Sequence, residues 1–182
     1  LAGGSGAITG DENTVVGRTA GYVLTSGEKN VIMGFAAGEA VTTGKENVII
    51  GRGACKDGTL ANATSTQGMY NVVVGSGAGN DLATGEANVL IGKLAGAEMT
   101  DNYNNVAIGR GSLGVCNGGE HNNIAIGVDT LGSDIAGSDH CIAIGSQALA
   151  AQNADVKNTV IGGLAGDAIT TAGNNTFVGY RA

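Results

Sequence analysis

The sequence of 182 residues contains no proline and no tryptophan, and its only aromatic residues are two Phe and four Tyr. Enzymes of this length ordinarily centre their cores on large aromatic side chains, so this core must consist mainly of Val, Ile, Leu and Ala. No apolar run approaches the 18 residues of a membrane-spanning helix, and we therefore expect no membrane insertion. These absences favour a thin, layered, structural protein.

Positive charge is also scarce. Nine Lys and Arg stand against 16 Asp and Glu, the net charge is −7, and the cations are scattered along the chain. A chain without a basic stripe is not expected to bind nucleic acid. Its three cysteines, Cys55, Cys116 and Cys141, are an odd number at unrelated places, so a disulfide framework is not expected and the compartment cannot be read from them.

Glycine, by contrast, is abundant, with 34 residues that do not follow the every-third-residue spacing of collagen. A motif of Asn (Cys in one copy), apolar residues and a closing Gly occurs ten times at intervals of 17 or 18 residues, with one interval of 24. This period predicts an all-β parallel solenoid (β-roll) of about ten coils, with residues 1–182 as a single unit. The closing glycines are Gly17, Gly34, Gly51, Gly75, Gly92, Gly109, Gly127, Gly145, Gly162 and Gly179.

Positions in each copy are counted from the closing glycine, which is position 0. The three residues before it are mostly β-branched and predict short strands. Alternation places positions −1 and −3 on one face of each strand and −2 on the other. Strands that are apolar on both faces are buried on both faces. We interpret the −2 stripe, which includes Ala107, Ala125 and Ala143, as a contact with another copy of the chain. The alternative is that this stripe packs beneath the connecting loops of its own chain.

Asn occupies position −4 in nine copies, and Cys141 replaces it once. Stacked at one corner, these amides are expected to form a structural ladder of hydrogen bonds up the column. A carbohydrate-binding role for the same column is the less favoured alternative. The ladder residues are Asn13, Asn30, Asn47, Asn71, Asn88, Asn105, Asn123, Asn158 and Asn175.

Several copies resemble known repeats. The segments 105–112, 123–130 and 141–148, such as Asn-Val-Ala-Ile-Gly-Arg-Gly-Ser, are similar to the head repeats of trimeric autotransporter adhesins, which are left-handed parallel β-rolls. Segment 158–171, Asn-Thr-Val-Ile-Gly-Gly-Leu-Ala-Gly-Asp-Ala-Ile-Thr-Thr, more closely resembles the repeats of bacteriophage and large-virus tail fibres. Both resemblances imply a homotrimer, and the adhesin resemblance implies a left-handed roll. The period, longer than in adhesin heads, favours the fibre.

The 24-residue interval contains seven extra residues, and we expect residues 56–70 to contain an inserted surface loop. Insertions in solenoids often lie on a binding face. Its candidate ligand-binding residues, for a host glycan or receptor, are Lys56, Asp57, Asn62, Thr64 and Tyr70. A tolerated surface bulge is the alternative. His121 and His140, each preceded by a carboxylate, are a minor candidate for a divalent metal site.

These features predict a structural fibre segment of a phage or virus tail fibre that serves host-surface attachment. The alternative is the head of a bacterial trimeric adhesin, and a β-helical acyltransferase or glycosidase comes third. We expect no enzymatic activity, no catalytic residues, no metal site and no cofactor. The expected partner is the chain itself, as a homotrimer, and the expected location is extracellular, on a virion tail fibre or a cell-surface appendage. The sequence is expected to be part of a longer fibrous protein.

Overall fold

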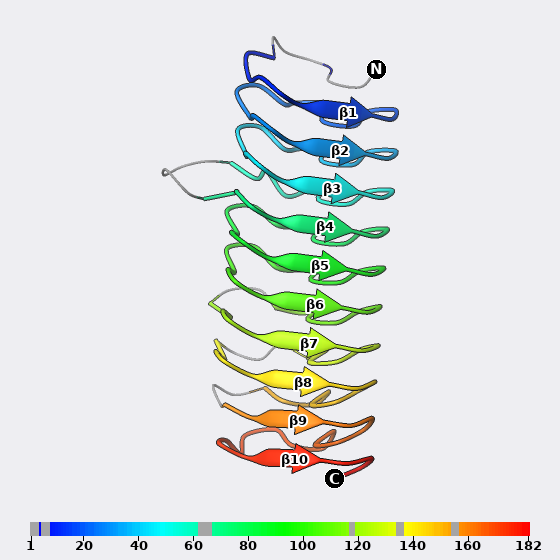
Figure 1. The fold of residues 1–182 in the computed structure, drawn as a ribbon, viewed down its shortest axis with the longest axis vertical. Coiled ribbons are helices and arrows are strands. Elements are labelled where there is room, and N and C mark those ends of the chain that lie inside the picture. Colours follow the sequence, from blue (N-terminus) through cyan, green and yellow to red (C-terminus); the bar gives the residue numbers. More distant parts are fainter. Residues whose placement is uncertain (1–3, 5–7, 62–66, 117–118, 134–136, 154–156) are drawn as a thin grey trace.

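The computed structural model describes residues 4, 8–61, 67–116, 119–133, 137–153 and 157–182. Ten three-residue strands form one parallel sheet in chain order (Figure 1). The described residues contain no helix that is long and apolar enough to cross a membrane. Each coil is numbered by its strand. The strands are β1 (Thr14–Val16), β2 (Val31–Met33), β3 (Val48–Ile50), β4 (Val72–Val74), β5 (Val89–Ile91), β6 (Val106–Ile108), β7 (Ile124–Ile126), β8 (Ile142–Ile144), β9 (Thr159–Ile161) and β10 (Thr176–Val178).

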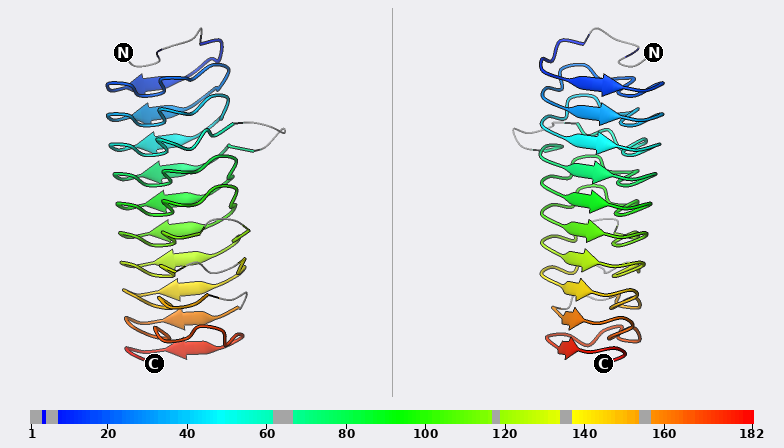
Figure 2. Two further views of the ribbon diagram at one scale, coloured as in Figure 1. Left: turned by 180° about the vertical axis from the view of Figure 1, so that it is seen from behind. Right: turned by 45° about the vertical axis from the view of Figure 1, so that its right-hand side comes forward.

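Equivalent repeat positions lie side by side in the sheet. Val48 pairs with Val72 across the 24-residue interval, and Ala107 pairs with Ala125 across an 18-residue one. Extra residues are therefore absorbed outside the strands, and repeat position fixes the column that a residue occupies along the rod. The predicted all-β parallel solenoid is confirmed, and Figure 2 shows the same stack of coils from two further sides.

The closing glycines are required by the corner that follows each strand. Gly51 has a φ of 135°, a conformation that L side chains rarely adopt. A Cβ atom at Gly51 would also clash with the backbone carbonyl of Gly75 in the next coil. The same clash recurs between successive closing glycines from Gly17 to Gly162. Neighbouring coils approach so closely at this corner that no side chain fits.

Position −2 points into the interior of the coil, where it is completely buried from β2 to β9. Ala107, Ala125 and Ala143 therefore belong to the core of their own chain, and the prediction that they contact another copy is wrong. Strand alternation separates two faces but carries no information about which one is inward. The space beside these alanines is filled by leucines of the same chain, as the alternative interpretation had it.

Positions −3 and −1 lie on the outer side of every strand and are half-buried or exposed. We call these two columns the apolar face, since Val, Ile and Met occupy all but three of its positions. Coils at the usual strand spacing of about 4.8 Å make this face roughly 45 Å long. The apolar face consists of Thr14, Val16, Val31, Met33, Val48, Ile50, Val72, Val74, Val89, Ile91, Val106, Ile108, Ile124, Ile126, Ile142, Ile144, Thr159, Ile161, Thr176 and Val178.

Candidate interaction surfaces

The apolar face is the largest candidate site on the rod. Val16, Ile91 and Ile161 keep exposed fractions of 52%, 37% and 41%, although each is a large aliphatic residue in a strand. Parallel sheets are normally covered on both sides, and a continuous apolar surface of this length marks an interaction site. Within the described parts of the chain, no segment covers this side of the strands (Figure 1).

Polar columns border the apolar face on both sides. Position +1 continues the outward alternation past the closing glycine and is exposed in Arg18, Arg52 and Lys93. Position −5 precedes the strand, has a positive φ in most coils and is exposed in Glu12 and Glu46. The outward surface therefore has an apolar centre and a charged margin on each side.

The asparagines at position −4 lie at a buried corner behind the sheet. The side-chain amide of Asn47 donates to Oδ1 of Asn30 (3.1 Å) and to the carbonyl of Gly68 (2.8 Å), and its backbone N–H donates to the same Oδ1 (3.0 Å). The pattern repeats from Asn13 up to Asn105. Since Asn30 to Asn105 are buried, these amides bind one another and the backbone, and they are not available to a ligand.

The Asn column changes at coil 8, where Cys141 replaces Asn. Nδ2 of Asn123 donates to the carbonyl of Ser138, and Oδ1 of Asn123 still accepts the backbone N–H of Cys141 (2.8 Å). Gln152 then inserts its buried amide, which donates to Sγ of Cys141 (3.3 Å) and accepts from Nδ2 of Asn158 (3.1 Å). Gln152 thus supplies from position +7 the carboxamide that Cys141 lacks.

A buried carboxylate lies beside the same corner and was not anticipated from the sequence. Glu120 is 1% exposed; its Oε2 accepts from Nδ2 of Asn102 (2.7 Å) and its Oε1 from the backbone N–H of Gly137 (3.0 Å). Glu120 and Asn102 occupy position −7, which is glycine in the first five coils. Aligning the copies at this position would have revealed the change to polar side chains.

The predicted ligand-binding residues of the insertion that the structure describes lie at two separate places. Lys56 and Asp57 are exposed and paired with each other (3.1 Å), and Nδ2 of Asn80 donates to Asp57 (2.9 Å). These contacts hold the pKa of Asp57 below its usual value, the Asn80 hydrogen bond contributing most. Tyr70 lies at position −5, on the other margin of the sheet, and Asn62 and Thr64 lie outside the described residues. Leu60 of the same segment is completely buried, so part of the insertion belongs to the core.

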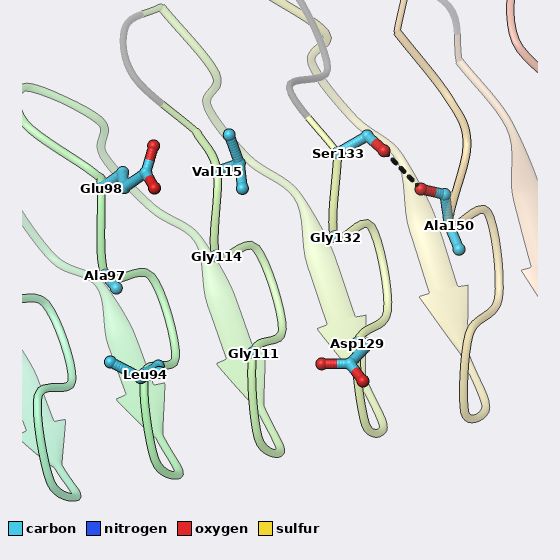
Figure 3. A pocket seen from close by; sticks show the side chains of 10 residues that line it. All are labelled: Leu94, Ala97, Glu98, Gly111, Gly114, Val115, Asp129, Gly132, Ser133 and Ala150. Carbon is cyan, nitrogen blue, oxygen red and sulfur yellow. Dashed lines mark hydrogen bonds between the residues drawn. The ribbon is translucent and has the colours of Figure 1, made fainter.

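A shallow groove of about 470 Å³ opens over the turns of coils 5 to 8 (Figure 3). It exists because Gly111, Gly114 and Gly132 leave gaps in columns that carry side chains in other coils. Glu98 lies on its rim, and Asp129 is paired with Arg110 (2.6 Å). The groove lacks a set of converging polar groups, and it indicates no particular ligand.

The histidines make different contacts. His121 stacks on the ring of Tyr103 (centroids 3.5 Å apart), and its Nδ1 accepts the backbone N–H of Tyr103 (3.2 Å). His140 of the next coil donates its backbone N–H to the carbonyl of His121 (3.3 Å). Among the described residues, no group of three or more His, Cys, Asp or Glu side chains is placed to hold a metal ion. All three cysteines, which lie within the described residues, are buried and form no disulfide.

Comparison with family models, with curated proteins and with solved structures finds no match to this chain. The functional argument therefore depends on the surfaces of the molecule itself.

Proposed function

We propose that this solenoid is a segment of a homo-oligomeric fibre, in which copies of the chain bury their apolar faces against one another. A stiff rod of this kind positions an attachment tip at a distance from its base. We infer a tail-fibre role in host-surface attachment, outside the cell, with three copies per fibre as the repeat resemblance implies. An adhesin head would use the same face in the same way.

The observation that carries this proposal is the apolar face, with Val, Ile or Met in 17 of 20 outward strand positions. Burial of apolar surface stabilises association in proportion to area. The face is flat and repeats at every coil, so a second copy, which has the same repeat, matches it along its whole length. The net charge of −7 keeps the remaining surface well hydrated and limits further aggregation.

A catalytic role is not proposed. The buried carboxylate, Glu120, is enclosed by Asn102 and the Gly137 backbone and faces no groove. The third candidate function, a β-helical acyltransferase or glycosidase, thus gains no support from the surfaces of the described residues.

The first test is the mass of the particle relative to the 17.8 kDa chain, measured by light scattering or sedimentation in dilute buffer. We expect an assembly of several chains, three if the resemblance holds. A folded species of a single chain at micromolar concentration would overturn the proposal.

The second test places charges on the apolar face. The triple variant Ile108→Asp, Ile126→Asp and Ile144→Asp is expected to give single chains, because the charges would be buried at the interface. A milder triple variant with Thr, which the chain itself uses at Thr159, guards against loss of folding. The control carries Asp at three exposed positions outside the face: Ser26, Asn153 and Thr171. Unchanged mass in both face variants would contradict the proposal.

A further inference from the structure

The charges on the two margins of the apolar face differ in sign. Position +1 carries four cations, which we call the basic margin: Arg18, Arg52, Lys93 and Arg110. Positions −6 and −5 carry six acids, which we call the acidic margin: Asp11, Glu12, Glu28, Glu46, Glu86 and Asp139. Three cations also lie on the acidic side: Lys29, Lys45 and Lys157. The two margins lie at opposite ends of the same strands.

Some of these charges have partners within the chain. Nζ of Lys45 pairs with Glu28 (3.1 Å), the guanidinium of Arg110 pairs with Asp129, and Asp139 accepts the backbone N–H of His121 (2.7 Å). Lys157 also makes an interaction within the chain. Within the basic margin, Arg18, Arg52 and Lys93 have no ion pair in the described part of the chain, although Arg18 also lies over the ring of Phe35 (5.6 Å).

The remaining charges match coil by coil. Coil 1 has Arg18 on one margin and Asp11 with Glu12 on the other; coil 3 has Arg52 and Glu46; coil 5 has Lys93 and Glu86. In coil 2 the acidic side has Lys29, and position +1 is the exposed ring of Phe35 instead of a cation. Residues six apart on an extended strand are separated by about 20 Å, so these charges cannot pair within one chain.

We propose that the copies pack in the same direction and the same coil register, with the basic margin of each against the acidic margin of the next copy. This inference rests on the self-association proposed above. Rotation about an axis parallel to the rod keeps every coil level with its counterpart. It therefore places Arg52 of one copy near Glu46 of its neighbour, and Phe35 near Lys29, a cation–π arrangement.

Reversing one copy removes this match. A two-fold axis parallel to the strands would place basic margin against basic margin, and coil 3 would face coil 8. Arg52 would then lie opposite Ser146, and Lys93 opposite Arg110. Ion pairs at the rim of an interface contribute little affinity but discriminate strongly between arrangements. The apolar face thus drives association, and the margins select its direction.

A charge swap in coil 3 tests the inference. Arg52→Glu and Glu46→Arg are each expected to weaken association about five- to tenfold at low salt, because an attraction becomes a repulsion. The double variant restores the pair at every interface and is expected to return to within about twofold of the parent. Sedimentation at low and high ionic strength measures these changes, which salt should reduce. Ser76→Glu, at position +1 of coil 4 opposite Tyr70, is the matched control and should change association less.

The outcomes separate the two proposals. An assembled parent with a double variant no tighter than the single variants would overturn the charge match and leave the fibre intact. Single variants that assemble like the parent would do the same. A parent that is a single chain would instead overturn the proposed function.

A cross-link gives independent proof of direction. Glu46→Cys combined with Arg52→Cys should be joined between chains by a short bis-maleimide, giving a covalent ring whose mass counts the copies. The native cysteines are completely or almost completely buried and should not react in the folded state. If the assembled sample yields no cross-linked chains, the proposed register is contradicted.

Discussion

Coils 1, 2, 4, 5 and 9 fill their interior from the strand, whereas coils 6, 7 and 8 fill it from the turn that follows. In the first group, position −2 is large and position +4 is glycine: Val15 with Gly21, Ile32 with Gly38, Val73 with Gly79, Leu90 with Gly96 and Val160 with Gly166. In the second group the sizes are exchanged: Ala107 with Leu113, Ala125 with Leu131 and Ala143 with Leu149.

The two positions face each other across the core. A Cβ atom at Gly96 would lie 2.9 Å from Cδ2 of Leu90, and one at Gly79 would lie 3.3 Å from Cγ1 of Val73. Coil 3 combines Ile49 with Cys55, a side chain of intermediate size. The comparison teaches that the side chains at positions −2 and +4 together fill one space in each coil, and that either position can supply the larger side chain.

The largest effect is expected from charging the strand side of the second group. The triple variant Ala107→Asp, Ala125→Asp and Ala143→Asp places three carboxylates in a dry interior, at a cost of several kcal/mol each. We expect loss of the folded solenoid, measured as loss of the cooperative thermal transition by circular dichroism. By contrast, the Asp substitutions at position −1 that test the proposed function should separate the chains without unfolding them. A folded −2 variant would show that the assignment of faces is wrong.

The exchange of sizes can be tested within coil 7. Ala125→Leu should cost about 1–3 kcal/mol by overpacking, and Leu131→Gly about 2–5 kcal/mol by leaving a cavity. The double variant gives coil 7 the pattern of coil 5 and should recover most of both losses. Glycine at residue 131 also suits its φ of 46°. Urea unfolding of the four proteins measures the coupling, and additive losses would contradict the pairing.

Coil 8 shows a similar exchange between positions −4 and +7. It has Cys141 and Gln152 where most coils have Asn and an apolar residue. Gln152→Leu should cost about 1–3 kcal/mol, because the buried amide of Asn158 loses one of its acceptors and keeps the carbonyl of Ala172. Adding Cys141→Asn restores an amide to the column beside a leucine, as coils 1 and 4 have, and should recover most of that loss. The thermal midpoint provides the measurement; a double variant less stable than Gln152→Leu would refute the compensation.

The smallest effect concerns Cys55 in the intermediate coil 3, where burial raises the pKa of the thiol from 9.0 to about 12. The thiol is neutral in both states at pH 7, and above pH 9 the unfolded state gains stability by ionising. Stability should therefore fall between pH 9 and pH 12, by about 1 kcal/mol at pH 10.

Cys55→Ala should lack this alkaline loss, whereas Cys55→Ser at pH 7 should cost about 1–3 kcal/mol by burying an unpaired hydroxyl. Denaturant unfolding at pH 7 and pH 10 gives the difference directly. Equal pH dependence of the parent and Cys55→Ala would show that the thiol is accessible in the folded protein.

The strands, their register and the closing corner follow from the sequence, because a triplet made mostly of β-branched residues precedes a glycine in all ten copies. The inward direction of position −2 does not follow from one column, since Ile at −1 and Ala at −2 are both apolar. It becomes readable when Ala125 is considered together with Leu131, which requires comparing two columns across the copies. Glu120 and Gln152 were missed because their hydrogen-bond partners lie in other coils or at other repeat positions, which a single column does not show.

Each strand contacts only the strands adjacent to it in the chain. The length of the rod can therefore change in steps of one whole coil. Duplicating or deleting one 17-residue unit would change its reach by an increment of about 4.8 Å while leaving its cross-section the same. The length of the fibre can then evolve by gain or loss of whole repeats, provided that the charged margins of corresponding coils stay level in every chain of the fibre.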